Sequence, residues 1–153
     1  MTEFTTDYDY LTSILRVLVA DTTLKSKVDA FYVDFPMSKI RDALSTNETL
    51  VSISMPSQHA RGSWGSATSK IQESSAIIQV DVISQHGENA KYVHEIASYV
   101  RDLLYLGTDI TLNDIQYQVY NDKIYIDLVE YNTDYSAWHL IMSVYIEYWR
   151  VAP

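Results

Sequence analysis

Two aspartates and four histidines are the residues of this chain whose chemistry could serve catalysis. Asp81 and Asp127 fall in segments expected to be β-strands, so they could approach each other as the carboxylate pair used in acid and base catalysis. The alternative is that both are ordinary strand residues facing solvent. The histidines are His59, His86, His94 and His139. They are scattered, and none is paired at the helical spacing of a metal-binding motif.

His94 is followed directly by Glu95, which suggests a general base. Neighbours in sequence point in different directions on a helix, so these two side chains do not converge on one substrate. We therefore expect the four histidines to be ordinary surface or strand residues.

The sequence lacks the usual motifs of catalysis and cofactor binding. It has no glycine-rich phosphate loop and no nucleophile elbow. It also has no cysteine that could form a disulfide, attack a substrate or bind zinc. The glycines of GSWGS, residues 62–66, open no helix and lack the spacing of a dinucleotide-binding fingerprint. We expect no enzymatic activity, no cofactor and no metal site.

Amphipathic patterns predict two main helices. The first runs from about Asp9 to Ala20, with Thr6 or Asp7 placed to cap it. The second follows residues 86–88 and ends before Gly107. Its apolar stripe consists of Val93, Ile96, Ala97, Val100, Leu103 and Leu104. A short helical turn from Pro36 to Leu44 is a further candidate, with an ordered loop as the alternative.

Alternating apolar and polar residues predict about five strands. They begin at about Leu50, Ala76, Ile115, Ile124 and Trp138. Asn121 and Asp122 are candidates for a two-residue hairpin turn between the third and fourth. The last strand, WHLIMSVYIEYWR, is longer than usual. This order predicts an α+β fold with a mainly antiparallel sheet of about five strands, and with one long and one N-terminal helix on one side.

Residues 57–75, SQHARGSWGSATSKIQESS, separate the first two strands. Their small and polar character predicts a long hairpin loop within a single domain of residues 1–153. Trp64 stands among the glycines and serines. An exposed Trp on a flexible loop typically anchors an interface, and the alternative is that Trp64 folds back onto its own domain.

The charge of the chain is unevenly distributed. The net charge is −9, and from Asp102 onward eight acidic residues stand against Lys123 and Arg150. Such a surface lacks the cations that grip phosphate, although DNA can pass close to it without adhering. Thirteen tyrosines suit both strands and protein interfaces. With no membrane-spanning apolar run and no signal peptide, we expect synthesis in the cytosol and no membrane association.

The order of elements resembles that of the tail terminator and tail-completion proteins of long-tailed bacteriophages. The similarity runs from about Leu11 to Trp149. It rests on the N-terminal helix, the DFP segment at residues 34–36, the hairpin with a long loop, the amphipathic helix and the ending SVYIEYW. The resemblance implies a hexameric ring that caps the tail tube, stops its polymerisation and joins the head while DNA passes through. It further implies a virion protein of the tail or neck, assembled in the host cytoplasm, with the tail tube protein and a head-completion or connector protein as partners.

A ring of head-to-tail contacts needs two different complementary patches on each subunit. Residues 57–75 carry Arg61 and Lys70 against Glu73, whereas the last third of the chain is strongly acidic. We predict that Arg61, Trp64 and Lys70 contact acidic residues of the adjacent subunit, with Trp64 as the apolar anchor. The alternatives are another phage neck protein (head-completion or connector), a ligand-binding or enzymatic α+β domain, and a dimeric interaction module.

Overall fold

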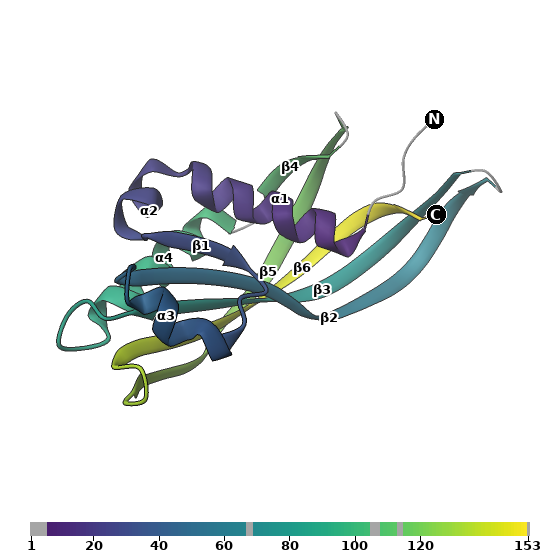
Figure 1. The fold of residues 1–153 in the computed structure, drawn as a ribbon. Coiled ribbons are helices and arrows are strands. Elements are labelled where there is room, and N and C mark those ends of the chain that lie inside the picture. The colour runs from purple at the N-terminus through teal and green to yellow at the C-terminus, as the bar shows by residue number, and fades with distance from the viewer. Residues whose placement is uncertain (1–5, 67–68, 105–107, 113–114, 153) are drawn as a thin grey trace.

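A computed structural model of the protein describes the backbone of residues 6–66, 69–104, 108–112 and 115–152 (Figure 1). The side chains of residues 7, 57–74, 105–122 and 148–153 are outside the described part. Among the described residues, no helix is both long and apolar enough to span a membrane.

Six strands form one sheet in the order β1-β2-β3-β6-β5-β4. The strands are β1 (Ala30–Val33), β2 (Thr49–Ser66), β3 (Ser69–Ser84), β4 (Thr108–Leu112), β5 (Ile115–Asn132) and β6 (Ala137–Ala152). β1 pairs with β2 in parallel, and the other described pairs are antiparallel. The helices are α1 (Asp7–Ala20), α2 (Thr22–Lys27), α3 (Ile40–Leu44), preceded by the 3-10 turn η1 (Met37–Lys39), and α4 (Lys91–Leu104). The predicted α+β class with a mainly antiparallel sheet is confirmed.

Local hydrogen bonds determine where the first two helices begin. Thr6 Oγ1 accepts a hydrogen bond from the Asp9 amide at 3.2 Å, and the Asp9 carboxylate accepts one from the Thr6 amide at 2.7 Å. This reciprocal capping box starts α1. Asp21 then ends α1 and caps α2, because its Oδ1 accepts from the Leu24 amide at 2.8 Å. The short α2 was not predicted from the sequence.

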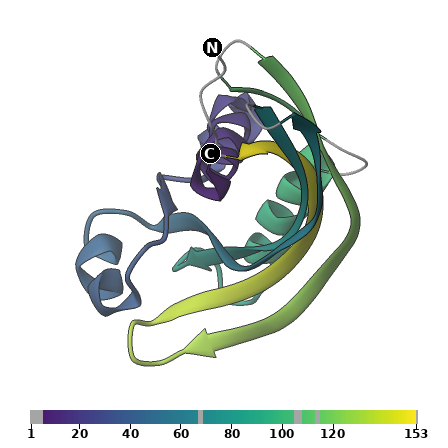
Figure 2. The same cartoon turned by 90° about the vertical axis from the view of Figure 1, so that its right-hand side faces the viewer.

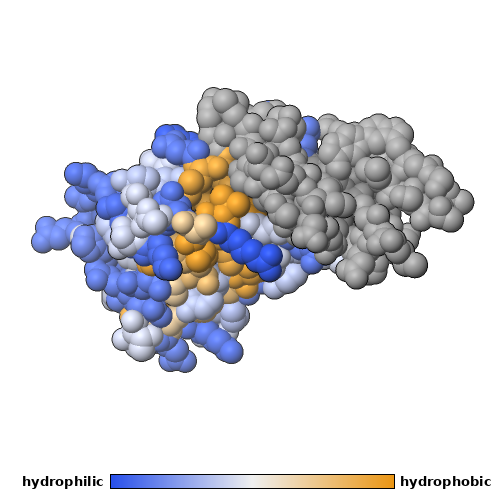
Figure 3. Space-filling view, turned by 90° about the horizontal axis from the view of Figure 1, so that it is seen from above, coloured by the Kyte–Doolittle hydropathy of each residue, from blue (hydrophilic) through white to orange (hydrophobic). Residues whose placement is uncertain are grey.

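α1 and α4 cover one face of the sheet, which curves around them (Figure 2). The main core lies between these layers, and the predicted stripe of α4 faces it, with Leu103 only partly buried. The buried residues of β2, β3 and β6 in this core are Val51, Ile53, Ala76, Ile78, Val80, Val82, Leu140, Met142, Val144 and Ile146. On α1, Leu15 and Val17 are only partly buried. Figure 3, seen from the α1 side, shows apolar residues reaching the surface there.

A smaller core lies on the opposite face of the sheet, beneath α3. It consists of Ile40, Leu44, Leu50, Ile83 and Ala137. Side chains alternate between the two faces of a strand, so Leu50 and Val51 serve different cores. The predicted helical turn after Pro36 is therefore present as η1 and α3, and α3 packs on the face away from α1 and α4.

The loop predicted for residues 57–75 is wrong, because β2 and β3 continue through it as paired strands. Their antiparallel pairing, which was predicted, runs from Thr49 opposite Ser84 to Ser66 opposite Ser69. β3 also pairs with β6 as far as Lys70 opposite Ala152. Residues 57–66 and 69–75 form a projecting hairpin, named the arm from here on (Figure 1). The glycines and serines of the arm show no alternating apolar pattern, so the sequence did not indicate strands there. The extended structure comes from backbone pairing of β3 with β2 on one side and with β6 on the other.

The hairpin turn predicted at Asn121 and Asp122 is also wrong. β5 runs straight through these positions, and a register shift between Asn121 and Lys123 absorbs one residue as a bulge. The actual reversal lies between Asn132 and Ala137, which pair with each other. Ser136 adopts a positive φ of 52° there. The predicted third and fourth strands are therefore one strand, β5, and β1 and β4 are additional.

Candidate assembly surface

Asp81 and His139 belong to a hydrogen-bonded chain on the face of the sheet opposite α1 and α4. His139 Nε2 lies 3.1 Å from Asp81 Oδ1, and His139 Nδ1 lies 3.0 Å from the Tyr135 hydroxyl. Gln79 Nε2 donates to the same carboxylate at 3.2 Å. Burial raises the pKa of Tyr135, with the Glu130 carboxylate as the second cause. His139 is 7% exposed, so this chain of hydrogen bonds anchors the β5–β6 connection to the sheet.

Asp127 has a different partner from Asp81. Its Oδ2 accepts a hydrogen bond from Ser143 Oγ on β6. Each aspartate is engaged by its own neighbours, so the two do not form the carboxylate pair considered from the sequence. In the described part of the chain, no group of three or more histidine, aspartate or glutamate side chains could hold a metal ion.

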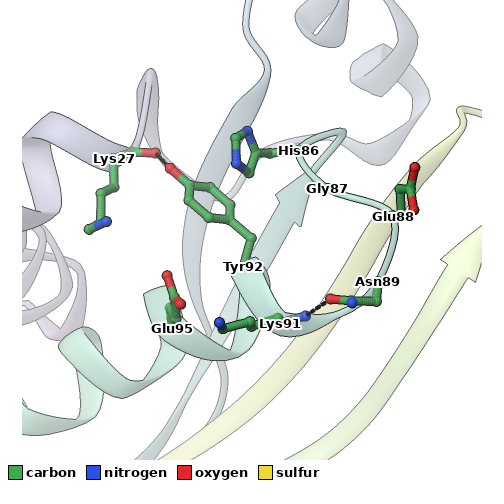
Figure 4. A pocket seen from close by; sticks show the side chains of 8 residues that line it. All are labelled: Lys27, His86, Gly87, Glu88, Asn89, Lys91, Tyr92 and Glu95. Atoms are coloured by element: carbon green, nitrogen blue, oxygen red, sulfur yellow. Dashed lines mark hydrogen bonds between the residues drawn. The ribbon is translucent and has the colours of Figure 1, made fainter.

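A polar recess of about 540 Å³ lies beside the start of α4, as Figure 4 shows. Its lining residues are Lys27, His86, Gly87, Glu88, Asn89, Lys91, Tyr92 and Glu95. The Tyr92 hydroxyl donates to the Lys27 carbonyl at 2.8 Å. His86 Nδ1 lies 2.9 Å from Glu48 Oε1. The lining contains two lysines and two glutamates, so the recess has no excess of one charge that would select an anionic or a cationic ligand.

Four of the eight large apolar side chains that are exposed in the described part of the chain lie on β5. Tyr125, Ile126, Leu128 and Tyr131 are between 40% and 53% exposed. Tyr145 on β6 continues the cluster, because its ring meets that of Tyr125 edge to face at a centroid distance of 5.9 Å. Large exposed apolar side chains gathered in one place mark interaction surfaces. We call β5 residues 123–132 the β5 rim.

The β5 rim is also a free edge of the sheet. β4 pairs with β5 only at residues 115–119, so residues 123–132 are paired with β6 on one side and with no described strand on the other. β2 is similar, because β1 pairs only with Leu50–Ile53. Beyond Pro56, residues 57–66 have β3 as their sole described partner. The two free edges lie on opposite sides of the sheet, and unpaired edges are templates for another chain.

The residues predicted to form the interface lie on the arm. Arg61 falls at the register shift between Ala60 and Gly62 on β2. Trp64 pairs through its backbone with Ile71, and Gly65 with Lys70. The backbones of Trp64 and Lys70 are therefore brought together, whereas the side chains of all three residues lie outside the described part. Their contacts remain a prediction.

The β5 rim was missed by the sequence reasoning. A signal was present, because KIYIDLVE places apolar residues on both faces of the strand. Ile126 lies opposite Met142 and Leu128 opposite Ile141, and these two β6 residues point to opposite faces. A strand with apolar side chains on both faces is either central in a sheet or covered by a partner.

Comparison with known proteins places the fold. No protein-family profile matches the chain, and no curated protein matches its sequence. A chain from the virion of a native gene transfer agent particle has the same fold, with a TM-score of 0.57 and 16% sequence identity over 91% of this chain and 92% of that chain. A second solved structure matches with a TM-score of 0.56 and 9% identity, over 94% of this chain and 91% of that chain. The protein therefore shares its whole fold with a chain of an assembled virion.

Proposed function

We propose that this protein is a structural component of a virion that assembles into a hexameric ring on the end of a tail tube. The ring stops tube polymerisation, presents the surface that joins the head, and leaves a channel for DNA. It works without catalysis, cofactor or metal. The observation that carries this proposal is the fold shared, over nine-tenths of both chains, with a chain of a gene transfer agent virion. Its partners are further copies of itself, the tail tube protein and a head-completion or connector protein.

Two features of the chain support assembly. The arm projects from the helix-covered part of the sheet (Figure 1), so it can reach a neighbouring subunit. The exposed apolar side chains of the β5 rim supply a second, different patch, as head-to-tail contacts require. In our proposal Arg61, Trp64 and Lys70 of the arm contact acidic residues of the next subunit.

Electron microscopy of tail tubes assembled with and without the protein tests the function. We expect a ring at one end of each tube and a defined tube length when the protein is present. Tubes that reach the same undefined lengths with and without the protein would contradict the terminator role.

Deletion of residues 60–70 tests the role of the arm. Residues 71–74 then remain to close the shortened hairpin between His59 and Ser75, which pair in the intact protein. We expect a folded monomer, with a single cooperative thermal unfolding transition, that no longer forms rings in solution or on tubes. Normal ring formation by this variant would show that the arm is dispensable.

The channel is expected to be net acidic, because the last third of the chain carries eight acidic residues against two basic ones. DNA would then pass without adhering, since tight phosphate binding needs Lys and Arg. Purified rings should therefore show no retention of duplex DNA in a mobility-shift assay at low salt. Strong retention, or a channel lined with cations in a map of the ring, would oppose this part of the proposal.

A further inference from the structure

We propose that subunits join edge to edge, with the β5 rim of one subunit adding to the free edge of β2, residues 57–66, in the next. The inference rests on the ring proposed above and names the surface that receives the arm. It predicts a sheet that continues from subunit to subunit around the ring.

The first argument is the position of the two edges. An unpaired strand edge binds another strand through its backbone hydrogen bonds. When two subunits pair through the same edge, the contact closes as a two-fold dimer. When one edge of a subunit pairs with a different edge of the next, each end of the growing chain keeps an unpaired edge, and the chain can close as a ring. Here the two free edges are on opposite sides of one sheet, which suits the second arrangement.

The second argument is the exposed side chains of the β5 rim. Ile126 is 48% exposed and Leu128 is 40% exposed, and they lie on opposite faces of the strand. A strand added at the edge would lie beside both side chains and bury part of each. Burial of apolar surface stabilises the contact by roughly 25 cal/mol per Å².

The third argument is charge. Residues 57–66 contain Arg61 and no acidic residue, whereas the β5 rim, residues 123–132, contains Lys123 against Asp127 and Glu130. Arg61 and Asp127 each sit at the register shift near the middle of its edge. If the two ten-residue edges are laid side by side over their full length, Arg61 lies opposite Asp127 in a parallel arrangement and opposite Leu128, next to Asp127, in an antiparallel one. Complementary charges at that point set the register of the contact.

Cysteine cross-linking tests the pairing directly, because the chain has no cysteine of its own. Arg61→Cys is combined in turn with Ile126→Cys, Asp127→Cys and Leu128→Cys. We expect at least one double variant to form a ladder of disulfide-linked oligomers up to the ring under mild oxidation. The single variants should stay unlinked, and a mixture of the two matching singles should give dimers only. Rings that form normally but link at none of these pairs would overturn the edge pairing and leave the ring intact.

The single variants also test the competing arrangement. Efficient dimers from Asp127→Cys alone would show two-fold pairing of β5 rims and would overturn the inference. If the unsubstituted protein forms no ring with or without tail tubes, the proposed function fails as well, so the two failures can be told apart.

Charge substitution supplies a second test that does not depend on cross-linking geometry. Leu128→Lys should weaken ring assembly by about tenfold or more, because a charge would be buried at the contact. Met37→Lys is the matched control, since Met37 is also 40% exposed but belongs to η1 and to neither edge. Equal assembly of the two variants, measured by analytical ultracentrifugation, would overturn the inference.

Exchange of the two charges gives the most specific test. Arg61→Asp alone and Asp127→Arg alone should each reduce assembly, and the double variant should recover it. Reduction by both single changes without recovery in the double variant would count against this pairing of Arg61 with Asp127.

Discussion

β3 and β5 pair with the two edges of the same strand, β6, yet their side chains have opposite surroundings. Ile78, Val80 and Val82 on β3 are fully buried. In the β5 rim no described side chain is buried. The β5 segment is the more charged of the two, since KIYIDLVE has three charged residues where AIIQVDVI has one. Composition alone does not explain the difference, because Ile126 and Leu128 are as apolar as the buried β3 residues and are still 48% and 40% exposed.

The cause is the extent of the helix layer. α4 packs mainly on β3 and β6, and its buried face continues the core over these strands. Residues of β5 such as Ile124 and Val129 reach only the margin of that core. An alternating pattern thus predicts that a strand has an apolar face. Whether that face is buried within the subunit depends on how far the helix layer extends over the sheet.

The largest difference in stability is expected between alanine substitutions of two leucines in this sheet. Leu140 on β6 is fully buried and Leu128 on β5 is 40% exposed. Leu140→Ala should lower the free energy of unfolding by about 2–5 kcal/mol, because it leaves a cavity in the core. Leu128→Ala should change it by less than about 0.5 kcal/mol. Urea denaturation of both variants measures the contrast, and similar losses would mean that β5 is covered in the monomer.

An intermediate effect is expected in the hydrogen-bonded chain on the other face. His139→Ala removes one hydrogen-bond partner each from the Asp81 carboxylate and the Tyr135 hydroxyl, which should cost about 1–3 kcal/mol of stability. Ser143→Ala removes the hydrogen bond to the exposed Asp127, and should cost less than about 0.5 kcal/mol. Thermal unfolding of the two variants compares them, and a loss for Ser143→Ala as large as that for His139→Ala would refute this ranking.

The smallest effect should appear only at alkaline pH. Burial raises the pKa of Tyr92 above the ordinary tyrosine value of 10.0, with the Glu48 and Asp29 carboxylates as further causes. A raised pKa means that the folded state holds the phenol proton more tightly, so this stabilisation is present below pH 10 and is lost as the pH rises through the folded pKa. Tyr92→Phe should therefore reduce the loss of stability above pH 10.

Denaturation midpoints of wild type and Tyr92→Phe between pH 8 and pH 11 test this expectation. The variant also lacks the hydrogen bond to the Lys27 carbonyl, so its stability at pH 8 is the reference for its own series. Parallel alkaline declines for the two proteins would be inconsistent with the raised pKa.

Elements with strong periodicity could be predicted from the sequence, and those defined by pairing could not. The stripe of α4 and the capping signal at Thr6 depend on local spacing, and both are present in the structure. The turn signal at Asn121 and Asp122 was overridden because β6 continues alongside and pairs with residues on both sides of it. The arm was missed for the same reason, since its strand structure comes from backbone partners distant in sequence.

The candidate interface was only partly accessible from the sequence. Arg61, Trp64 and Lys70 could be selected because unusual residue types stand out in a Gly- and Ser-rich segment. The β5 rim could not, because Tyr125, Ile126 and Leu128 look like ordinary strand residues until the reach of the helices is known. Exposure of a strand depends on tertiary layers that no local pattern contains.

The position of β6 has a consequence for how the protein folds. β6 follows every other described strand in the sequence but occupies an inner place in the sheet, between β3 and β5. Until β6 is in place, β3 and β5 have no direct pairing with each other, and each exposes an unpaired edge. Long-range strand pairing of this kind is intrinsically slow, and its intermediates aggregate readily. Because β6 follows β5 through the short reversal between Asn132 and Ala137, it can pair with β5 locally, whereas its pairing with β3 joins distant segments. The last step of folding is therefore expected to be the pairing of β6 with β3, which joins the two halves of the sheet at its middle.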